Sequence, residues 1–322
     1  MIEKLDAISQ LVGNTPLKKL QLYDLDIYAK LEYNNFTGSV KDRAALNVLK
    51  QGVANGDIDQ DTHIVESSSG NFAIALATMC KELGLKFTAV IDPNINALYE
   101  RYISLIAHDV VKVEKLDKTG GYLLTRIETV KDICAKEKNS FWTNQYENPN
   151  NYLAYYNGLG LEIADSFPAL DYLFVAVSSC GTVTGLSQRL KEIYPNIKVI
   201  AVDVEGSVVF DCQPKKRNVT GLGASKRPIT IEKAKLDGFI HVSEQNIIKA
   251  SRDLLEEQQI FGGASTGASY HAIKEYFKDK ETQGLKVVFL CHDKGYAYMN
   301  TVYDDLWAQK IAGSSQLETI DY

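Results

Sequence analysis

The sequence lacks the features expected of a secreted, membrane-bound or metal-binding chain. Its five cysteines are odd in number and have no CxxC spacing, which argues against a disulfide framework or a zinc site. No apolar run is long enough to span a membrane, and the N-terminal MIEKLDAISQ has no signal-peptide pattern. The five histidines show no metal-ligand spacing, and neither H-E-x-x-H nor G-x-S-x-G occurs. We therefore expect a cytoplasmic protein without a bound metal.

The chain also has fewer positively than negatively charged residues. The chain has 35 Lys and Arg residues against 41 Asp and Glu residues, which gives a net charge of −6. Nucleic acids and anionic membranes bind basic surfaces, so neither is an expected partner. The other proportions, 45% apolar and 24% charged residues, are those of an ordinary globular protein. A length of 322 residues is sufficient for two subdomains.

Strand-like apolar runs alternate with helical patterns over most of the chain. This alternation predicts an α/β protein with two open, twisted, mostly parallel sheets covered by helices. A self-contained run of strand–helix units predicts a smaller domain over 42–148, and 1–41 together with 149–322 would form the larger domain. We expect a long irregular region at 205–237 and a loose tail at 313–322.

Three loops rich in glycine and hydroxyl groups precede predicted helices. Ligands of parallel α/β sheets bind where a strand ends and a helix begins. The loop SSSGNFA (67–73) suits a carboxylate or a phosphate. The loop SSCGTVTG (178–185) suits an anion, although it matches neither G-x-G-x-x-G nor the P-loop pattern. FGGASTGASY (261–270) is the third, and each loop could equally be a helix cap without a ligand.

One lysine stands where its charge is unfavourable. In NNFTGSVKDR (34–43), Lys41 and Arg43 fall in the first turn of a predicted helix, whose N-terminus favours anions. The helix and the neighbouring Arg43 would both lower the pKa of Lys41 and leave a neutral amine, which can form a Schiff base. The alternative is a solvated lysine countered by Asp42. A Schiff-base lysine with loops for a carboxylate and a phosphate is what a pyridoxal phosphate enzyme acting on an amino acid requires.

Seven motifs follow one another in the order found in the cysteine synthase family. They cover nearly the whole chain and are LVGNTPL (11–17), KLEYNNFTGSVKDR (30–43), ESSSGN (66–71), NQYENPNN (144–151), GTVTG (181–185), GLGAS (221–225) and GASTG (263–267). The chain thus resembles the cysteine synthase and cystathionine β-synthase family of fold-type II pyridoxal phosphate enzymes. The resemblance implies a tryptophan synthase β-like fold, pyridoxal 5'-phosphate as the cofactor, β-replacement as the reaction, and a homodimer.

The resemblance also implies roles for individual residues. Lys41 would bind the cofactor as a Schiff base and move the Cα proton, and Asn71 would bond the ring hydroxyl oxygen. Ser265 would face the pyridine nitrogen, and a neutral serine there favours β-elimination over transamination. The cofactor phosphate would bind to Ser178, Ser179, Cys180, Gly181 and Thr182. The substrate carboxylate would bind to Ser68, Ser69 and Gln145.

Within the family, the chain is most similar to the branch that makes N-(2-amino-2-carboxyethyl)-L-glutamate. KLEYNN, TGGYLLTRI (119–127), NQYEN and GLGAS carry this similarity. The implied reaction joins O-phospho-L-serine to L-glutamate and releases phosphate, as the first step to 2,3-diaminopropionate for siderophores of the staphyloferrin B type. Glutamate brings two carboxylates, so its site needs fixed positive charge. Arg126 is the candidate, with Tyr146 in the same pocket, although an arginine within a helix is usually a surface residue.

Departures from the family pattern keep other reactions open. Phe72 stands where ordinary cysteine synthases have threonine, and Asp293-Lys294-Gly295 replaces Asp-Ser-Gly. The alternative function is a cysteine synthase acting on O-acetylserine or O-phosphoserine, or a related enzyme that uses another thiol. A non-catalytic protein that kept the fold is a third interpretation. It predicts loss of Lys41 or of the phosphate loop, and the sequence retains both.

Overall fold

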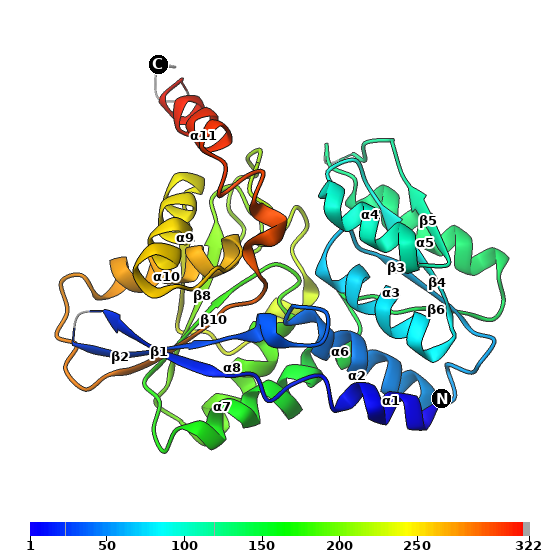
Figure 1. The fold of residues 1–322 in the computed structure, drawn as a ribbon, viewed down its shortest axis with the longest axis horizontal. Coiled ribbons are helices and arrows are strands. Elements are labelled where there is room, and N and C mark those ends of the chain that lie inside the picture. The colour runs from blue at the N-terminus through cyan, green and yellow to red at the C-terminus, as the bar shows by residue number, and fades with distance from the viewer. Residues whose placement is uncertain (23, 119, 318–322) are drawn as a thin grey trace.

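The protein consists of two lobes, each built on one sheet (Figure 1). The computed structural model describes residues 1–22, 24–118 and 120–317, the last four of these by their backbone alone. Two sheets, mostly parallel and covered by helices, confirm the predicted fold class. None of the described helices is both long and apolar enough to cross a membrane.

The larger lobe contains a six-stranded sheet with the strand order β1-β2-β10-β7-β8-β9. Its strands are β1 (Leu17–Leu22), β2 (Leu25–Lys30), β7 (Tyr172–Ala176), β8 (Lys198–Val204), β9 (Gly238–Val242) and β10 (Lys286–Leu290). The hairpin of β1 and β2 is antiparallel, and the other pairs are parallel. Central strands such as β10 are continuous apolar runs because helices cover both of their faces.

Helices lie on both faces of this sheet (Figure 1). One face carries α9 (Glu244–Gln258) and α10 (Ala264–Phe277), and the other carries α7 (Gly160–Ser166) and α8 (Gly181–Ile193). The remaining elements of this lobe are α6 (Pro149–Ala154), the π-helical η2 (Tyr155–Leu159), α11 (Asp305–Leu317) and the 3-10 helices η1 (Glu32–Asn34), η3 (Ile229–Lys233) and η4 (Gly295–Tyr298).

The smaller lobe contains a four-stranded parallel sheet with the order β5-β4-β3-β6. Its strands are β3 (His63–Ser67), β4 (Lys86–Ile91), β5 (Asp109–Lys112) and β6 (Ser140–Trp142). Its helices are α1 (Ile2–Ser9), α2 (Lys41–Ala54), α3 (Asn71–Leu83), α4 (Ala97–Ile106) and α5 (Leu123–Lys136). One apolar cluster contains Leu76 of this lobe as well as Val175 and Leu186 of the larger one, so the two lobes share a core.

Three parts of the structure refine the sequence predictions. The predicted alternation of strands and helices did not include α1 and β1. The prediction of an irregular region at 205–237 holds except for the short η3. The tail prediction for 313–322 is wrong as far as residue 317, because α11 continues to Leu317 and packs against α9. Residues 318–322 lie outside the described part of the chain.

Candidate active site

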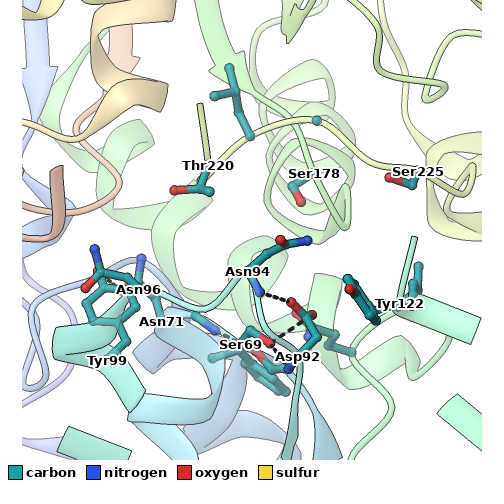
Figure 2. Close-up of a pocket in the computed structure, with 18 of the residues that line it drawn as sticks. Ser69, Asn71, Asp92, Asn94, Asn96, Tyr99, Tyr122, Ser178, Thr220 and Ser225 are labelled. Carbon is teal, nitrogen blue, oxygen red and sulfur yellow. Dashed lines mark hydrogen bonds between the residues drawn. The ribbon is translucent and has the colours of Figure 1, made fainter. Parts of the chain in front are cut away.

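A cavity of about 360 Å³ lies between the two lobes, and we call it the outer cavity (Figure 2). A smaller cavity of about 50 Å³, the inner cavity, adjoins it. Both are lined by Lys41, Asn71, Ser178 and Gly221. Among the predicted site residues, the outer cavity also gathers Ser68, Ser69, Arg126, Gln145 and Tyr146. The inner cavity adds Ser179, Cys180, Thr182 and Ser265.

Lys41 is the first residue of α2 and lines both cavities. Its Nζ donates to Ser179 Oγ at 3.1 Å. Burial lowers the pKa of Lys41 to about 8, while Cys180, Asp293 and Glu66 act in the opposite direction. The predicted direction is therefore right. The predicted contribution of Arg43 is wrong, because loss of hydration is the main influence on Lys41 and Arg43 is not among the others. A substantial neutral fraction of this amine exists near neutral pH.

Arg43 does not face Lys41, because two carboxylates, Glu32 and Glu162, hold it on the opposite side of α2. Its Nε lies 2.6 Å from Glu32 Oε2 and its Nη1 lies 2.6 Å from Glu162 Oε1. Lys30 Nζ completes the group at 2.9 Å from Glu162 Oε2. Asp42 is not a counter-ion for Lys41 either, since its carboxylate accepts a bond from Thr37 N at 2.5 Å. This network anchors the start of α2, and with it the backbone of Lys41.

The loop after β3 and the loop after β6 meet beneath the outer cavity. The buried carboxylate of Glu66 joins them: Oε1 accepts from Ser67 N at 2.8 Å, and Oε2 accepts from Gln145 N at 3.3 Å and from Thr143 Oγ1. Burial raises the pKa of Glu66 to about 7. This junction brings Ser68, Ser69 and Gln145, which are far apart in the sequence, to one wall of the outer cavity.

The loop from Ser178 to Cys180 connects β7 to α8, and these three residues, with Thr182 in the first turn of α8, line the inner cavity. A helix start of this kind has free N–H groups that favour an anion. Cys180 turns the chain with a φ of 63° and is buried, which raises the pKa of its thiol. Gly181 lies outside the wall of both cavities. Its small size is required elsewhere, since a Cβ would lie 2.4 Å from Asn151 Oδ1. The prediction that this glycine contacts a ligand has no direct geometric support.

The far end of the inner cavity is formed by α10 and by the end of β10. Ser265 Oγ is buried and has no hydrogen-bond partner among the described residues. His292 also lines this end; burial lowers its pKa to about 3, so the ring is neutral. The sequence analysis considered the histidines only as possible metal ligands, so it missed this position. The inner cavity therefore ends in a hydroxyl group and an uncharged ring beside the carboxyl group of Asp293.

A chain of hydrogen bonds connects the two lobes at the cavities. Asn71 Nδ2 donates to Asp293 Oδ2 at 2.7 Å, and Tyr99 donates to Asn71 Oδ1 at 2.8 Å. Tyr298 donates to Asp293 Oδ2 at 2.9 Å. Burial raises the pKa of Asp293 to about 6. Asn71, which the family resemblance places against the cofactor ring, is thus held in one orientation by both lobes.

Arg126 points into the outer cavity rather than to the protein surface. Its Nη1 donates to Ser69 Oγ at 2.9 Å, and its Nε lies 3.2 Å from Asp92 Oδ2. Asp92 Oδ2 also accepts from Ser69 Oγ at 3.1 Å, as Figure 2 shows. Tyr146 lines the same cavity, as predicted. The cation expected for an acceptor site, Arg126, therefore lines the cavity. The carboxylate of Asp92 lies beside it and was not predicted.

Comparison with known sequences decides the family. A family model described as pyridoxal-phosphate dependent enzyme matches residues 8–293. The chain belongs to this family. Its cofactor is accordingly pyridoxal 5'-phosphate, and it is an enzyme of the transferase type, as the sequence analysis expected.

Individual relatives agree with this placement. The chain is 42% identical over 314 residues to N-(2-amino-2-carboxyethyl)-L-glutamate synthase of Ralstonia nicotianae, which covers 96% of this chain and 92% of the relative. The solved structure of O-acetylserine-dependent cystathionine β-synthase from Helicobacter pylori is 28% identical, with a TM-score of 0.84 over 91% of this chain and 97% of that chain. O-ureido-L-serine synthase is 27% identical, with a TM-score of 0.85 over 93% and 95% of the two chains.

The residues of the inner cavity fit this cofactor. Lys41 supplies an amine that is easily deprotonated for the aldehyde. The start of α8 would offer N–H and hydroxyl groups to the phosphate. The buried Ser265 hydroxyl lacks a partner among the described residues and would be available to the ring nitrogen. The ring nitrogen and the aldehyde need no charged partner. The phosphate dianion needs positive potential, and the N-terminus of α8 provides it.

The sequence analysis did not assign a site role to several residues that the structure places here. Asp92, Asn94 and Asn96 lie in the loop after β4 (Figure 2). Asp293 lies after β10. The rule applied to the other loops, that ligands gather at the carboxyl ends of parallel strands, would have selected them. Glu66 lies within a strand and below the surface of the cavity, and the sequence contains no comparable signal for it.

Proposed function

We propose that this enzyme catalyses β-replacement on O-phospho-L-serine with L-glutamate as the amine nucleophile, giving N-(2-amino-2-carboxyethyl)-L-glutamate and phosphate. The observation that carries the proposal is Arg126, a guanidinium that lines the same cavity as Lys41. The relative from Ralstonia nicotianae, which carries the name of this product, supports it. The reaction would supply a precursor of 2,3-diaminopropionate.

Pyridoxal phosphate, when bound, supplies an aldehyde for amines and an electron-withdrawing ring that acidifies the Cα proton of an amino acid. Lys41 would hold the aldehyde carbon, Asn71 the ring hydroxyl oxygen, and Ser265 the ring nitrogen. The phosphate would be held by Ser178, Ser179, Cys180, Thr182 and the N–H of Gly181. Because Ser265 is a neutral group, the ring nitrogen would remain largely unprotonated, which favours elimination at Cβ over transamination.

The donor amino acid would bind at the wall of the outer cavity where Glu66 connects the loops after β3 and β6. Ser68, Ser69 and Gln145 would hold its carboxylate with neutral donors. Lys41 would take the proton from Cα and return it there after the acceptor has added. A pKa near 8 suits both roles, because the amine is present in both protonation states at neutral pH.

The acceptor would bind in the part of the outer cavity that Arg126 and Tyr146 line. A guanidinium can hold a carboxylate with two parallel hydrogen bonds. Without acceptor, Arg126 Nη1 donates to Ser69 Oγ and Nε lies 3.2 Å from Asp92 Oδ2. Burial raises the pKa of Tyr146, so its hydroxyl remains a donor. Sulfide would need no such cation, and this distinguishes the proposal from the cysteine synthase alternative.

We also expect motion and assembly that follow from the family resemblance. The four-stranded sheet lies within the predicted smaller domain, 42–148, and the outer cavity takes its walls from both lobes. We propose that this domain, together with α1, which packs against α2 and α3, moves toward the rest of the predicted larger one, 1–41 with 149–322, when substrate binds. A homodimer remains a prediction, which size-exclusion chromatography with light scattering tests.

The test of the function is a comparison of acceptors. Phosphate release from O-phospho-L-serine by the cofactor-loaded enzyme is measured with L-glutamate and with sulfide, and products are identified by mass spectrometry. We expect a clear preference for glutamate, and a preference for sulfide would instead favour the cysteine synthase alternative. Arg126→Gln is expected to raise the KM for glutamate by about 10- to 100-fold, because a charged hydrogen-bond pair is lost. Arg101→Gln on the exposed face of α4 is the matched control.

A further inference from the structure

Asp92 is a carboxylate in a cavity for which the proposed function requires positive charge. The residue follows β4 and is only 6% exposed. Its Oδ1 accepts from Asn94 N at 2.9 Å, and its Oδ2 accepts from Ser69 Oγ at 3.1 Å (Figure 2). Oδ2 also lies 3.2 Å from Arg126 Nε. A buried carboxylate is costly to desolvate, so its position at a ligand cavity calls for a partner or a task.

The charges of the outer cavity define what can bind there. Among the residues that line it, Lys41, Asp92 and Arg126 carry formal charge. Lys41 is committed to the cofactor and the Cα proton, which leaves one anion and one cation 3.2 Å apart. An amino acid that acts as a nucleophile carries an ammonium group and a carboxylate, whereas sulfide carries neither. A carboxylate next to a guanidinium is complementary to that pair of charges.

We propose that Asp92 binds the ammonium group of the acceptor amino acid and accepts its proton, while Arg126 binds an acceptor carboxylate. This inference rests on the proposed function and deepens it. Without acceptor, the two side chains neutralise each other. When the acceptor enters, Asp92 pairs with its ammonium group and Arg126 pairs with its carboxylate. The net charge of the site therefore stays balanced.

The proton transfer is required by the chemistry of an amine acceptor. An ammonium nitrogen has no lone pair and must lose one proton before it can attack. The proton passes to a carboxylate oxygen of Asp92, and the freed lone pair forms the N–Cβ bond. This bond replaces the Cβ–O bond, whose electron pair leaves with phosphate. The proton on Asp92 passes to solvent, and no oxidant or reductant is involved.

A simpler role for Asp92 would be only to orient Arg126, without any contact to the ammonium group. The two roles predict different effects on a ligand that has no ammonium group. Glutarate has the carboxylates of glutamate but no ammonium group, so its binding reports on Arg126 without Asp92. If Asp92 binds the ammonium group, Asp92→Asn affects glutamate and spares glutarate. If Asp92 only orients Arg126, the substitution affects both ligands equally.

The experiment measures the KM for L-glutamate and the inhibition constant of glutarate with cofactor-loaded wild type and Asp92→Asn. We expect the KM for glutamate to rise about 50-fold, as for a lost charge-assisted hydrogen bond, and the inhibition constant of glutarate to change less than about 3-fold. Asp109→Asn, an exposed carboxylate at the start of β5, is the matched control and should change neither.

Each outcome has a distinct meaning. Equal weakening of both ligands, or no change for glutamate, overturns the role of Asp92 and leaves the proposed function standing. Retained glutarate binding also shows that the variant is folded. If the wild type accepts sulfide but no amino acid, the proposed function fails and this inference fails with it. That result is seen in the wild type alone, before any variant is made.

Discussion

Lys41 and Arg43 are two cations in the first turn of one helix, and their surroundings are opposite. Arg43 forms ion pairs with Glu32 and Glu162 on one side of α2. Lys41 lines the cavities on the other side and forms no ion pair within the described residues; its Nζ donates only to Ser179 Oγ. Pairing keeps Arg43 charged, while enclosure without a carboxylate partner favours the neutral form of Lys41. The same helix turn thus separates a structural charge from a reactive amine.

Removal of the amine tests the reactive side of this comparison. Lys41→Met is expected to lower turnover by about 10⁴-fold or more, because the residue that moves the Cα proton is lost. Phosphate release measures turnover, and the absorbance band of bound cofactor should disappear with it. Borohydride reduction followed by peptide mapping checks the attachment point. Label on a peptide without Lys41 would contradict the assignment.

Removal of the guanidinium tests the structural side. Arg43→Met is expected to lower the free energy of unfolding by about 3–5 kcal/mol, because it leaves the buried Glu32 and the partly buried Glu162 with reduced compensation. Urea unfolding of the cofactor-free protein measures this change. Lys18→Met on β1, which is not part of the network, serves as a control. A loss below about 1 kcal/mol would show that the four charges do not anchor α2.

The pH dependence of stability sharpens the comparison further. The pKa of Lys41 is about 8 in the folded protein against 10.5 when unperturbed, so the unfolded chain binds more protons between these values and stability rises with pH there. Lys41→Met removes the buried charge and should stabilise the cofactor-free protein by roughly 3 kcal/mol below pH 8. The advantage should vanish as the pH rises to about 10.5. Urea unfolding of both proteins across this range measures the difference; an advantage independent of pH would refute the explanation by charge burial.

The smallest effect concerns a neutral group of the inner cavity. Ser265→Ala should weaken cofactor binding about 10-fold, since one neutral hydrogen bond is lost. The variant should not destabilise the cofactor-free protein, because Ser265 Oγ has no partner among the described residues. Cofactor titration followed by absorbance, with thermal unfolding of the cofactor-free form, separates the two quantities. Unchanged cofactor affinity would remove Ser265 from the proposed ring-nitrogen contact.

Much of the fold could be predicted because its signals are local. Alternating apolar strands and helices indicate parallel sheets wherever the two periodicities are clear. The loops at 67–73 and 178–185 were recognisable since glycine and hydroxyl residues follow a strand in each. β1 was missed because LKKLQL has only weak alternation at a sheet edge. α11 was missed because its end, GSSQL, has the composition of a tail.

The sequence by itself determined the alternation of elements, the polar loops and the presence of Lys41 at a helix start. Only the tertiary structure decided which polar and charged side chains meet. Glu162 reaches Arg43 across 119 residues and Asp293 reaches Asn71 across 222. Local sequence patterns do not encode such partners, because they depend on how helices pack on two different sheets. The pKa of Lys41 belongs to this second class, since its main cause is enclosure by segments from both lobes.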